Sequence, residues 1–255
     1  MTPNGITDME TDTKEHEFSV EHEGEPSDSL VIGLSEFGLA GLTAANYLVE
    51  QLGLEKTGCI TTESLPSITP FEDGRPRHHT RFFSSDDADF TVLVGELFIP
   101  PDDAREFADA VMGWTEKGSV EEITLLSGIV AAHGPEQHDV FFVATDDYRP
   151  KVEGTLEPMG GGFLEGVHAD LLARGIDTPL SVGALVTPAH PPAQDVEAAL
   201  RLINSFEDVH DAEVDTEPLE EHAEELKQHY EQLAERMEKV QNESIRRVAE
   251  DRAYM

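Results

Sequence analysis

The chain has 255 residues, with 53 aspartates and glutamates against 17 lysines and arginines, so its formal net charge is −36. This length suits one large domain with extensions. So negative a charge excludes a protein that binds nucleic acid by neutralising phosphates, and it argues against an anionic membrane as a partner. Because molar salt screens self-repulsion, the acidity is typical of a cytoplasmic protein from a salt-accumulating halophile. An acidic mesophilic protein is the alternative.

The first segment of the chain, residues 1–28, contains nine acidic residues and one lysine, with almost no apolar periodicity. This composition predicts a disordered acidic tail. The first residues lack the pattern of a signal peptide. The single cysteine, Cys59, excludes an intrachain disulfide and fits a reducing cytoplasm.

Residues 29–214 alternate between short apolar runs and segments with helical spacing. Such alternation predicts an α/β fold, a three-layer α/β/α sandwich around a mostly parallel sheet. We expect strands at 29–34, 59–61, 80–83, 90–94, 122–127, 140–144 and 180–186, and helices at 38–52, 102–117, 163–174 and 194–206.

Residues 215–255 have a different pattern, in which apolar residues recur at spacings of four and three. This heptad pattern predicts a long helical arm, on the order of 50 Å at 1.5 Å per residue. The arm either associates with other subunits or packs on its own domain. The heptad positions are Leu219, Ala223, Leu226, Tyr230, Leu233, Met237, Val240 and Ser244.

Two groups of glycines precede expected helices, namely Gly33, Gly38 and Gly41, and Gly160, Gly161 and Gly162. Backbone N–H groups at a helix N-terminus can bind an anion. Neither group matches the G-x-G-x-x-G or the Walker A pattern. Close packing of a helix on a strand, or a tight connection, is the competing interpretation.

The only basic cluster comprises Arg75, Arg77, His78, His79 and Arg81. It could bind an acidic partner segment or form a salt network between subunits, and a solvated loop is the alternative. The adjacent histidines lack the spacing of metal ligands, because neighbouring side chains on a strand point to opposite faces. We therefore expect no metal site.

No catalytic constellation can be recognised. Ser127 lies in Leu-Ser-Gly, which lacks the first glycine of the G-x-S-x-G motif. Asp146 and Asp147 follow an expected strand, where α/β proteins place active sites, but a turn also explains them. The sequence thus indicates neither a cofactor nor an enzyme.

The sequence ends in Ala253-Tyr254-Met255, directly after the expected arm. Tyrosine is a rigid amphipathic anchor. A terminal carboxylate can pair with a lysine or with backbone N–H groups of a partner. These three residues are therefore a candidate docking tail, and a frayed helix end is the alternative.

Five parts of the sequence stand in a characteristic order, namely 33–41, 80–81 with 90–96, 162–172 with 175–176, 195–200, and the arm. In this order they resemble the archaeal branch of the proteasome assembly chaperone family, and the resemblance covers about 29–255. It implies a fold similar to nucleoside phosphorylases, a homo-oligomer of three to five subunits, no cofactor, and binding of Ala253, Tyr254 and Met255 to α subunits of the 20S proteasome.

Two other functions remain open from the sequence. The first is an enzyme of nucleosidase or phosphorylase type that uses the glycine loops to bind an anion. The second is a scaffold without a proteasome partner, in which the heptads only hold subunits together.

Overall fold

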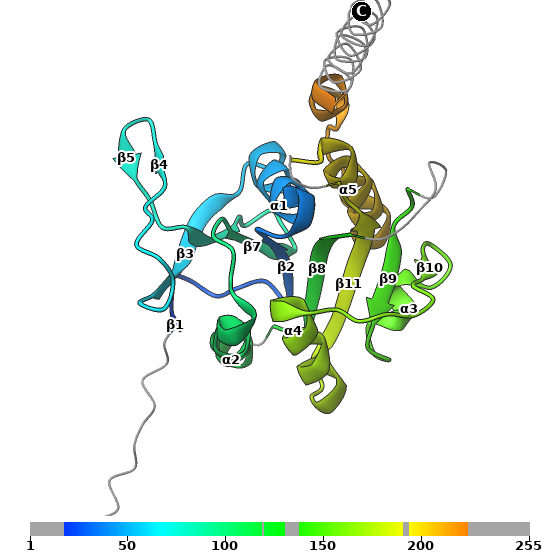
Figure 1. Ribbon diagram of the computed structural model, residues 1–255, viewed down its shortest axis with the longest axis horizontal. Helices are drawn as coiled ribbons and strands as arrows, with labels where there is room; N and C mark the ends of the chain where they lie inside the picture. The colour runs from blue at the N-terminus through cyan, green and yellow to red at the C-terminus, as the bar shows by residue number, and fades with distance from the viewer. Residues whose placement is uncertain (1–17, 119, 131–137, 191–193, 224–255) are drawn as a thin grey trace, which may run out of the picture.

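The computed structural model describes residues 18–118, 120–130, 138–190 and 194–223, in which a nine-stranded sheet runs between helices (Figure 1). The strand order is β1-β3-β6-β7-β2-β8-β11-β9-β10. The strands of this sheet are β1 (Phe18–His22), β2 (Ser29–Leu34), β3 (Glu55–Thr62), β6 (Thr80–Ser84), β7 (Phe90–Gly95), β8 (Glu122–Ile129), β9 (Phe141–Ala144), β10 (Glu157–Pro158) and β11 (Ser181–Pro188).

The centre of the sheet consists of β7, β2, β8 and β11, which pair in parallel. Their apolar runs are almost continuous, and Leu30, Val31 and Ile32 of β2 are completely buried. This is expected for strands covered on both faces. Antiparallel pairs lie toward both edges, and β10 joins β9 through two residues. The prediction of an α/β fold with a large, mostly parallel central sheet is confirmed.

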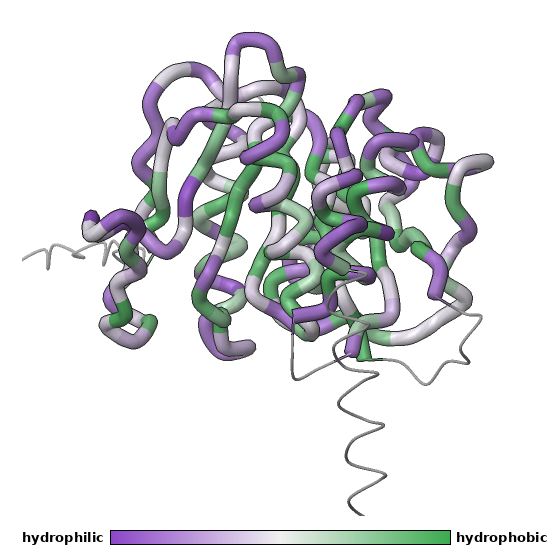
Figure 2. The backbone as a smooth tube through the Cα atoms, turned by 90° about the horizontal axis from the view of Figure 1, so that it is seen from above, coloured by the Kyte–Doolittle hydropathy of each residue, from purple (hydrophilic) through white to green (hydrophobic). Residues whose placement is uncertain are grey.

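The helices cover both faces of the sheet. Helices α1 and α5 pack together on one face, and α2 and α4 pack together on the other (Figure 1). Hydrophobic residues concentrate along the central strands (Figure 2). None of the described helices has the length and hydropathy needed to cross a membrane. The helices are η1 (Phe37–Leu39), α1 (Ala40–Gln51), α2 (Pro101–Gly118), α3 (Arg149–Val152), α4 (Gly166–Asp177) and α5 (Val196–His210).

The expectation of a disordered segment over 1–28 is wrong for its last part. Phe18–His22 forms β1, which pairs antiparallel with β3. Phe18 is buried, with its ring centroid 5.4 Å from that of Phe107 in α2. An edge strand needs apolar residues only on alternate positions, so Phe18 and Val20 suffice among acidic neighbours. Residues 1–17 lie outside the described part of the chain.

Some smaller elements escaped the sequence patterns. Strands β4 (Phe71–Glu72) and β5 (Arg75–Pro76) form a hairpin that projects from the body of the molecule (Figure 1). Helix α4 begins at Gly166 rather than at residue 163, because Glu165 is extended and Gly166 has a positive φ of 67°. Helix α5 continues to His210.

The beginning of the predicted arm packs on its own domain. Residues 217–223 are helical, and Leu219 and Ala223 are buried in the core cluster that α1 and α5 share. The Tyr47 hydroxyl of α1 donates a hydrogen bond to the carbonyl of Asp215 at 2.7 Å. The heptad positions from Leu226 onward lie outside the described residues.

Candidate functional site

A cavity of about 720 Å³ opens at the carboxyl ends of β2 and β8. Its walls come from residues 34–39, 127–130 and 162–168, with further contacts from Phe98, Ile99, Pro101 and Met159. After β2 the chain forms β3, β6 and β7 on one side of that strand, and it then crosses to β8 on the other side. Open α/β sheets bind ligands at such a switch point, and this volume is within the range of ligand pockets.

Glycines allow the first turn of α1 to approach these strands. A Cβ atom on Gly41 would lie 2.0 Å from the carbonyl oxygen of Leu126 in β8, and one on Gly33 would lie 2.3 Å from the Cβ of Ala45. These contacts support the packing interpretation for both glycines. Gly38 has a positive φ of 64°, and its carbonyl accepts the Asp195 N–H at 2.7 Å.

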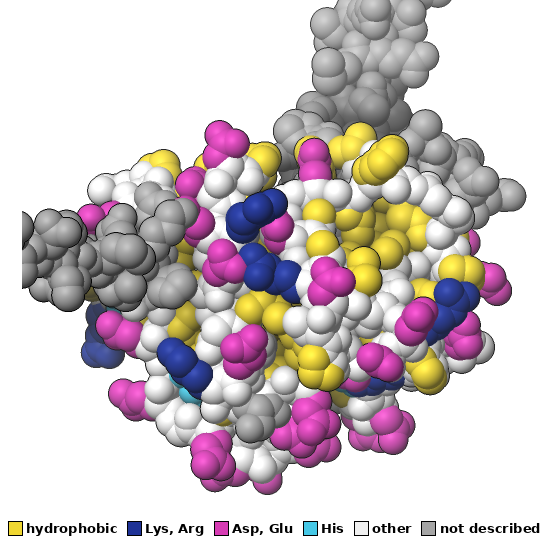
Figure 3. All heavy atoms as spheres, turned by 90° about the horizontal axis from the view of Figure 1, so that it is seen from below, with side chains coloured by type: hydrophobic (Ala, Val, Ile, Leu, Met, Phe, Trp, Pro, Cys, Tyr) yellow, Lys and Arg dark blue, Asp and Glu magenta, His cyan; other side chains and the backbone are white. Residues whose placement is uncertain are grey.

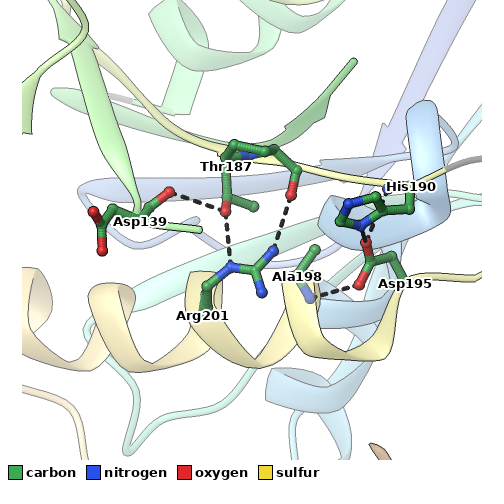
Figure 4. Close-up of polar contacts among 7 residues, drawn as sticks. Asp139, Thr187, His190, Asp195, Ala198 and Arg201 are labelled. Carbon is green, nitrogen blue, oxygen red and sulfur yellow. Dashed lines mark hydrogen bonds and ion pairs between the residues drawn. The ribbon is translucent and has the colours of Figure 1, made fainter. Parts of the chain in front are cut away.

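Asp195 fixes the start of α5 beside this loop (Figure 4). One carboxylate oxygen accepts the Ala198 N–H at 2.9 Å, which is an N-cap. The other accepts the His190 N–H at 2.9 Å and contacts the His190 ring at 2.8 Å. Burial opposes ionisation of Asp195, but these hydrogen bonds outweigh it and lower the pKa of the carboxyl.

Arg201 ties α5 to the end of β11 (Figure 4). Its Nε donates to the Thr187 hydroxyl at 3.0 Å, and one Nη donates to the Pro188 carbonyl at 2.9 Å. Thr187 in turn donates to the Asp139 carbonyl at 3.1 Å. Burial lowers the pKa of Arg201, although arginine stays protonated at neutral pH. This cluster holds the rim of the sheet in place.

The polar centre of the cavity is Glu36. Its Oε2 accepts a hydrogen bond from the Ser127 hydroxyl at 3.2 Å and lies 2.9 Å from Nδ1 of His168. An ionised carboxylate only accepts hydrogen bonds, so both neighbours donate to it. The His168 side chain is 2% exposed, and its Nε2 is buried with no hydrogen-bond partner in the described part of the chain.

This geometry differs from a nucleophilic triad. The Ser127 hydroxyl bonds to the carboxylate of Glu36 and not to the imidazole of His168, so the serine–histidine hydrogen bond of a triad is missing. The cavity walls contain the carboxylates of Glu36 and Glu165, and no lysine or arginine occurs among the described lining residues. These charges disfavour an anion at this position, and with it the phosphorylase interpretation of the glycine loops.

Comparison with known proteins identifies the family. Residues 30–234 match the PAC2 family over most of the chain. This chain belongs to the PAC2 family. A search of curated proteins found no match to this sequence.

Solved structures share the PAC2 fold. PbaA of Pyrococcus furiosus, an archaeal homologue of proteasome-assembly chaperone, superposes with a TM-score of 0.75 at 20% identity, over 88% of this chain and 99% of PbaA. PbaB of the same organism, an archaeal proteasome activator, gives 0.72 at 19% identity over 86% and 99%. A Thermoplasma acidophilum protein of unknown function gives 0.70 at 22% identity over 87% and 91%. At these identities the likeness shows the fold.

The PAC2 domain neutralises part of its basic cluster internally. Arg77 and Arg81 both bind the carboxylate of Glu96, Arg81 at 3.1 Å, and Arg77 also lies 3.4 Å from Glu72. Burial lowers the pKa of Arg81, and Glu96 opposes this effect. These two arginines therefore hold β5, β6 and the end of β7 together.

The remaining members of the cluster lie apart from the cavity of the PAC2 domain. Arg75 and His78 are exposed at the β4–β5 hairpin, and His79 lies 2.9 Å from the Thr80 hydroxyl. No group of three or more potential metal ligands occurs within the described residues.

The remaining positions singled out in the sequence are the second glycine group, the aspartate pair and the docking tail. Gly160, Gly161 and Gly162 are all exposed, and of the three only Gly162 lines the cavity. Asp146 and Asp147 lie in a turn, and β9 runs antiparallel to β11, so these residues lie at the opposite edge from the cavity. The docking tail at 253–255 lies outside the described residues.

Sequence reasoning missed Glu36 and His168 of the PAC2 cavity. It considered Ser127 only as a nucleophile. The sequence did contain a signal, because Glu36 lies two residues after β2 and Ser127 lies within the last three residues of β8. Polar residues after neighbouring parallel strands converge at one edge of a sheet.

Proposed function

We propose that this PAC2 protein is an ATP-independent chaperone or adaptor of the archaeal proteasome. It binds α subunits of the 20S particle through Ala253, Tyr254 and Met255 and aids assembly or docking. The observation that carries the proposal is membership of the PAC2 family over residues 30–234. The fold shared with PbaA and PbaB supports it. PbaA is described as a homologue of proteasome-assembly chaperone and PbaB as a proteasome activator. The proposed function includes no catalytic step.

The arm is the means of presenting the tail. Leu219 and Ala223 anchor the start of the arm in the domain core. Tyr254 supplies the apolar contact and the Met255 carboxylate supplies the charged one. In a homo-oligomer of three to five subunits, several arms raise the effective concentration of weak individual contacts.

The surface charge shapes this interaction. Acidic side chains are spread over the face seen in Figure 3, with few basic ones between them. In the cytoplasm of a salt-accumulating archaeon, that charge is screened within about 3 Å at molar salt. Recognition then depends on apolar contact and on the terminal carboxylate rather than on bulk charge.

Affinity purification at high salt tests the proposal. We expect the intact chain to co-purify with 20S particles, and we expect deletion of 253–255 to abolish this. Tyr254→Ala should cause most of the same loss, because it removes the apolar contact, and Asp251→Asn serves as a matched control just outside the tail.

Sedimentation of each variant checks that the oligomer survives, so that loss of binding is not loss of assembly. Equal co-purification of the intact and the tail-deleted chain would overturn the proposal.

A further inference from the structure

The cavity at the ends of β2 and β8 has an exposed apolar rim. Large hydrophobic side chains that are exposed normally occur singly on a surface. Here four exposed hydrophobic side chains line the same cavity, and one of them, Phe163, is completely exposed. Apolar walls around a few polar groups are typical of a small-molecule site. The rim residues are Phe37, Phe98, Val130 and Phe163.

The polar group that the cavity offers to a ligand is the Glu36 carboxylate, which accepts hydrogen bonds. Ser127 and His168 both donate to Oε2 of Glu36, which leaves Oε1 without a hydrogen-bond partner in the described part of the chain. The Glu36 side chain is 23% exposed, so a ligand in the cavity can reach that oxygen. Nε2 of His168 is buried, so Oε1 of Glu36 is the acceptor that the cavity offers. A ligand that satisfies the centre must therefore donate.

The negative charge of the cavity lining favours a positively charged ligand. Glu36 and Glu165 are the carboxylates of the described lining, and neither lysine nor arginine accompanies them there. A carboxylate partly removed from water attracts a cation more strongly than one in bulk solvent. A protonated amine combines positive charge with N–H donors, which a metal cation lacks.

We propose that this cavity binds a small organic cation, with an aromatic or aliphatic body against the rim and a protonated amine on Glu36. The inference does not depend on a proteasome partner, because it uses neither the arm nor the tail. The anionic ligand expected of a glycine-loop enzyme is the opposite prediction for the same cavity.

Three probes with one ring system test the proposal on the full-length protein. Tryptamine carries a protonated amine, tryptophol a neutral hydroxyl and indole-3-propionate a carboxylate. Titration calorimetry in about 1 M KCl suppresses diffuse binding of cations to the acidic surface. We expect tryptamine to bind saturably at one site per chain, tryptophol to bind about tenfold or more weakly, and indole-3-propionate not to bind.

Matched variants locate the site. Glu36→Gln should weaken tryptamine about tenfold or more, because it removes the charge and keeps an acceptor for Ser127 and His168. Glu121→Gln removes the same charge at the exposed, opposite end of β8 and should leave binding unchanged. Phe163→Ala should weaken tryptamine without affecting the fold, because that ring is completely exposed.

Three results would overturn the inference. One is equal binding of tryptamine to Glu36→Gln and Glu121→Gln, which would mean adventitious binding to an acidic surface. Another is preference for the anionic probe. The last is the absence of saturable binding to the assembled protein, which would mean that a neighbouring polypeptide fills the cavity instead.

Discussion

The two ends of strands β2 and β8 use the same residue types in different ways. At the amino ends, the Ser29 hydroxyl donates to Oε1 of Glu122 at 3.1 Å, and Lys151 of α3 binds the same oxygen. At the carboxyl ends, Ser127 donates to Glu36 in the cavity. One glutamate thus has an ammonium partner within the fold, and the other faces an open hollow.

A histidine lies near each end of these strands, and the two histidines differ in how many of their ring nitrogens have a partner. At the amino ends, His210 has Nδ1 3.3 Å from the Lys151 ammonium and Nε2 2.9 Å from the Thr124 hydroxyl. The Thr124 hydroxyl lies 2.7 Å from that of Tyr148. At the carboxyl ends, Nε2 of His168 has no partner within the described residues. A satisfied network stabilises a fold, whereas the Glu36 carboxylate stays partly exposed to the cavity and can bind a ligand.

The largest expected effect is the total loss of stability at the amino-end network when the pH falls from 6.5 toward 3. Burial, with Lys151 nearby, lowers the pKa of His210 to about 3. In the unfolded chain the ring has a pKa near 6.5, so protonation favours unfolding as the pH falls from 6.5 toward 3. The loss is on the order of 1.4 kcal/mol per pH unit in that window, and none is expected above it.

Urea unfolding at pH 7 and at pH 5 measures this effect, with His210→Gln as the reference for all other titrating groups. The wild type should lose about 2 kcal/mol more than the variant between these pH values. Parallel losses in the two proteins would contradict the assignment of His210 as a buried neutral ring.

The next effect concerns the carboxyl ends. Gly41→Ala should destabilise the protein by about 3 kcal/mol, because the new methyl group would lie 2.0 Å from a backbone oxygen of β8 that cannot rotate away. Gly113→Ala in α2 is the matched control, since nothing lies within 4 Å of its Cβ position. It should be neutral or stabilise the helix by up to about 1 kcal/mol. Similar melting temperatures for the two variants would refute the packing role of Gly41.

The smallest effect compares one hydroxyl at each end. Thr124→Val leaves the buried Tyr148 hydroxyl and His210 Nε2 without partners and should cost about 2 kcal/mol. Ser127→Ala should cost less than about 1 kcal/mol, because Glu36 keeps His168 and access to water. Denaturant midpoints of the two variants, measured side by side, compare these losses of stability. Equal losses would contradict the claim that the hydroxyl at the amino ends contributes more to stability than the one at the carboxyl ends.

The sequence predicted most of the fold because the buried strands have clear patterns. The central strands read as apolar runs, since both of their faces are covered. Strand β1 was missed because the acidic residues on both sides of it dominate the local composition, although one apolar face suffices at an edge. The short elements, such as α3 and β10, have too few residues for any periodicity.

The candidate site was predicted less well, because it arises only when the chain folds. Glu36 and Ser127 are 91 residues apart, and no spacing rule connects them. The glycines were recognised, but their pattern does not distinguish packing from anion binding. The distances from Gly33 and Gly41 to neighbouring atoms favour packing. The charges around the cavity, which also depend on the fold, point to a cation rather than an anion.

The last strand of the sheet has a consequence for assembly. Strand β10 pairs with β9 through only Glu157 and Pro158, and proline has no backbone N–H to offer to a further strand. Exposed strand edges are templates on which other chains add, and a short edge with proline prevents this. Growth of this sheet from molecule to molecule is therefore blocked on the β10 side, and β1 is the only edge of the described sheet where another strand could be added.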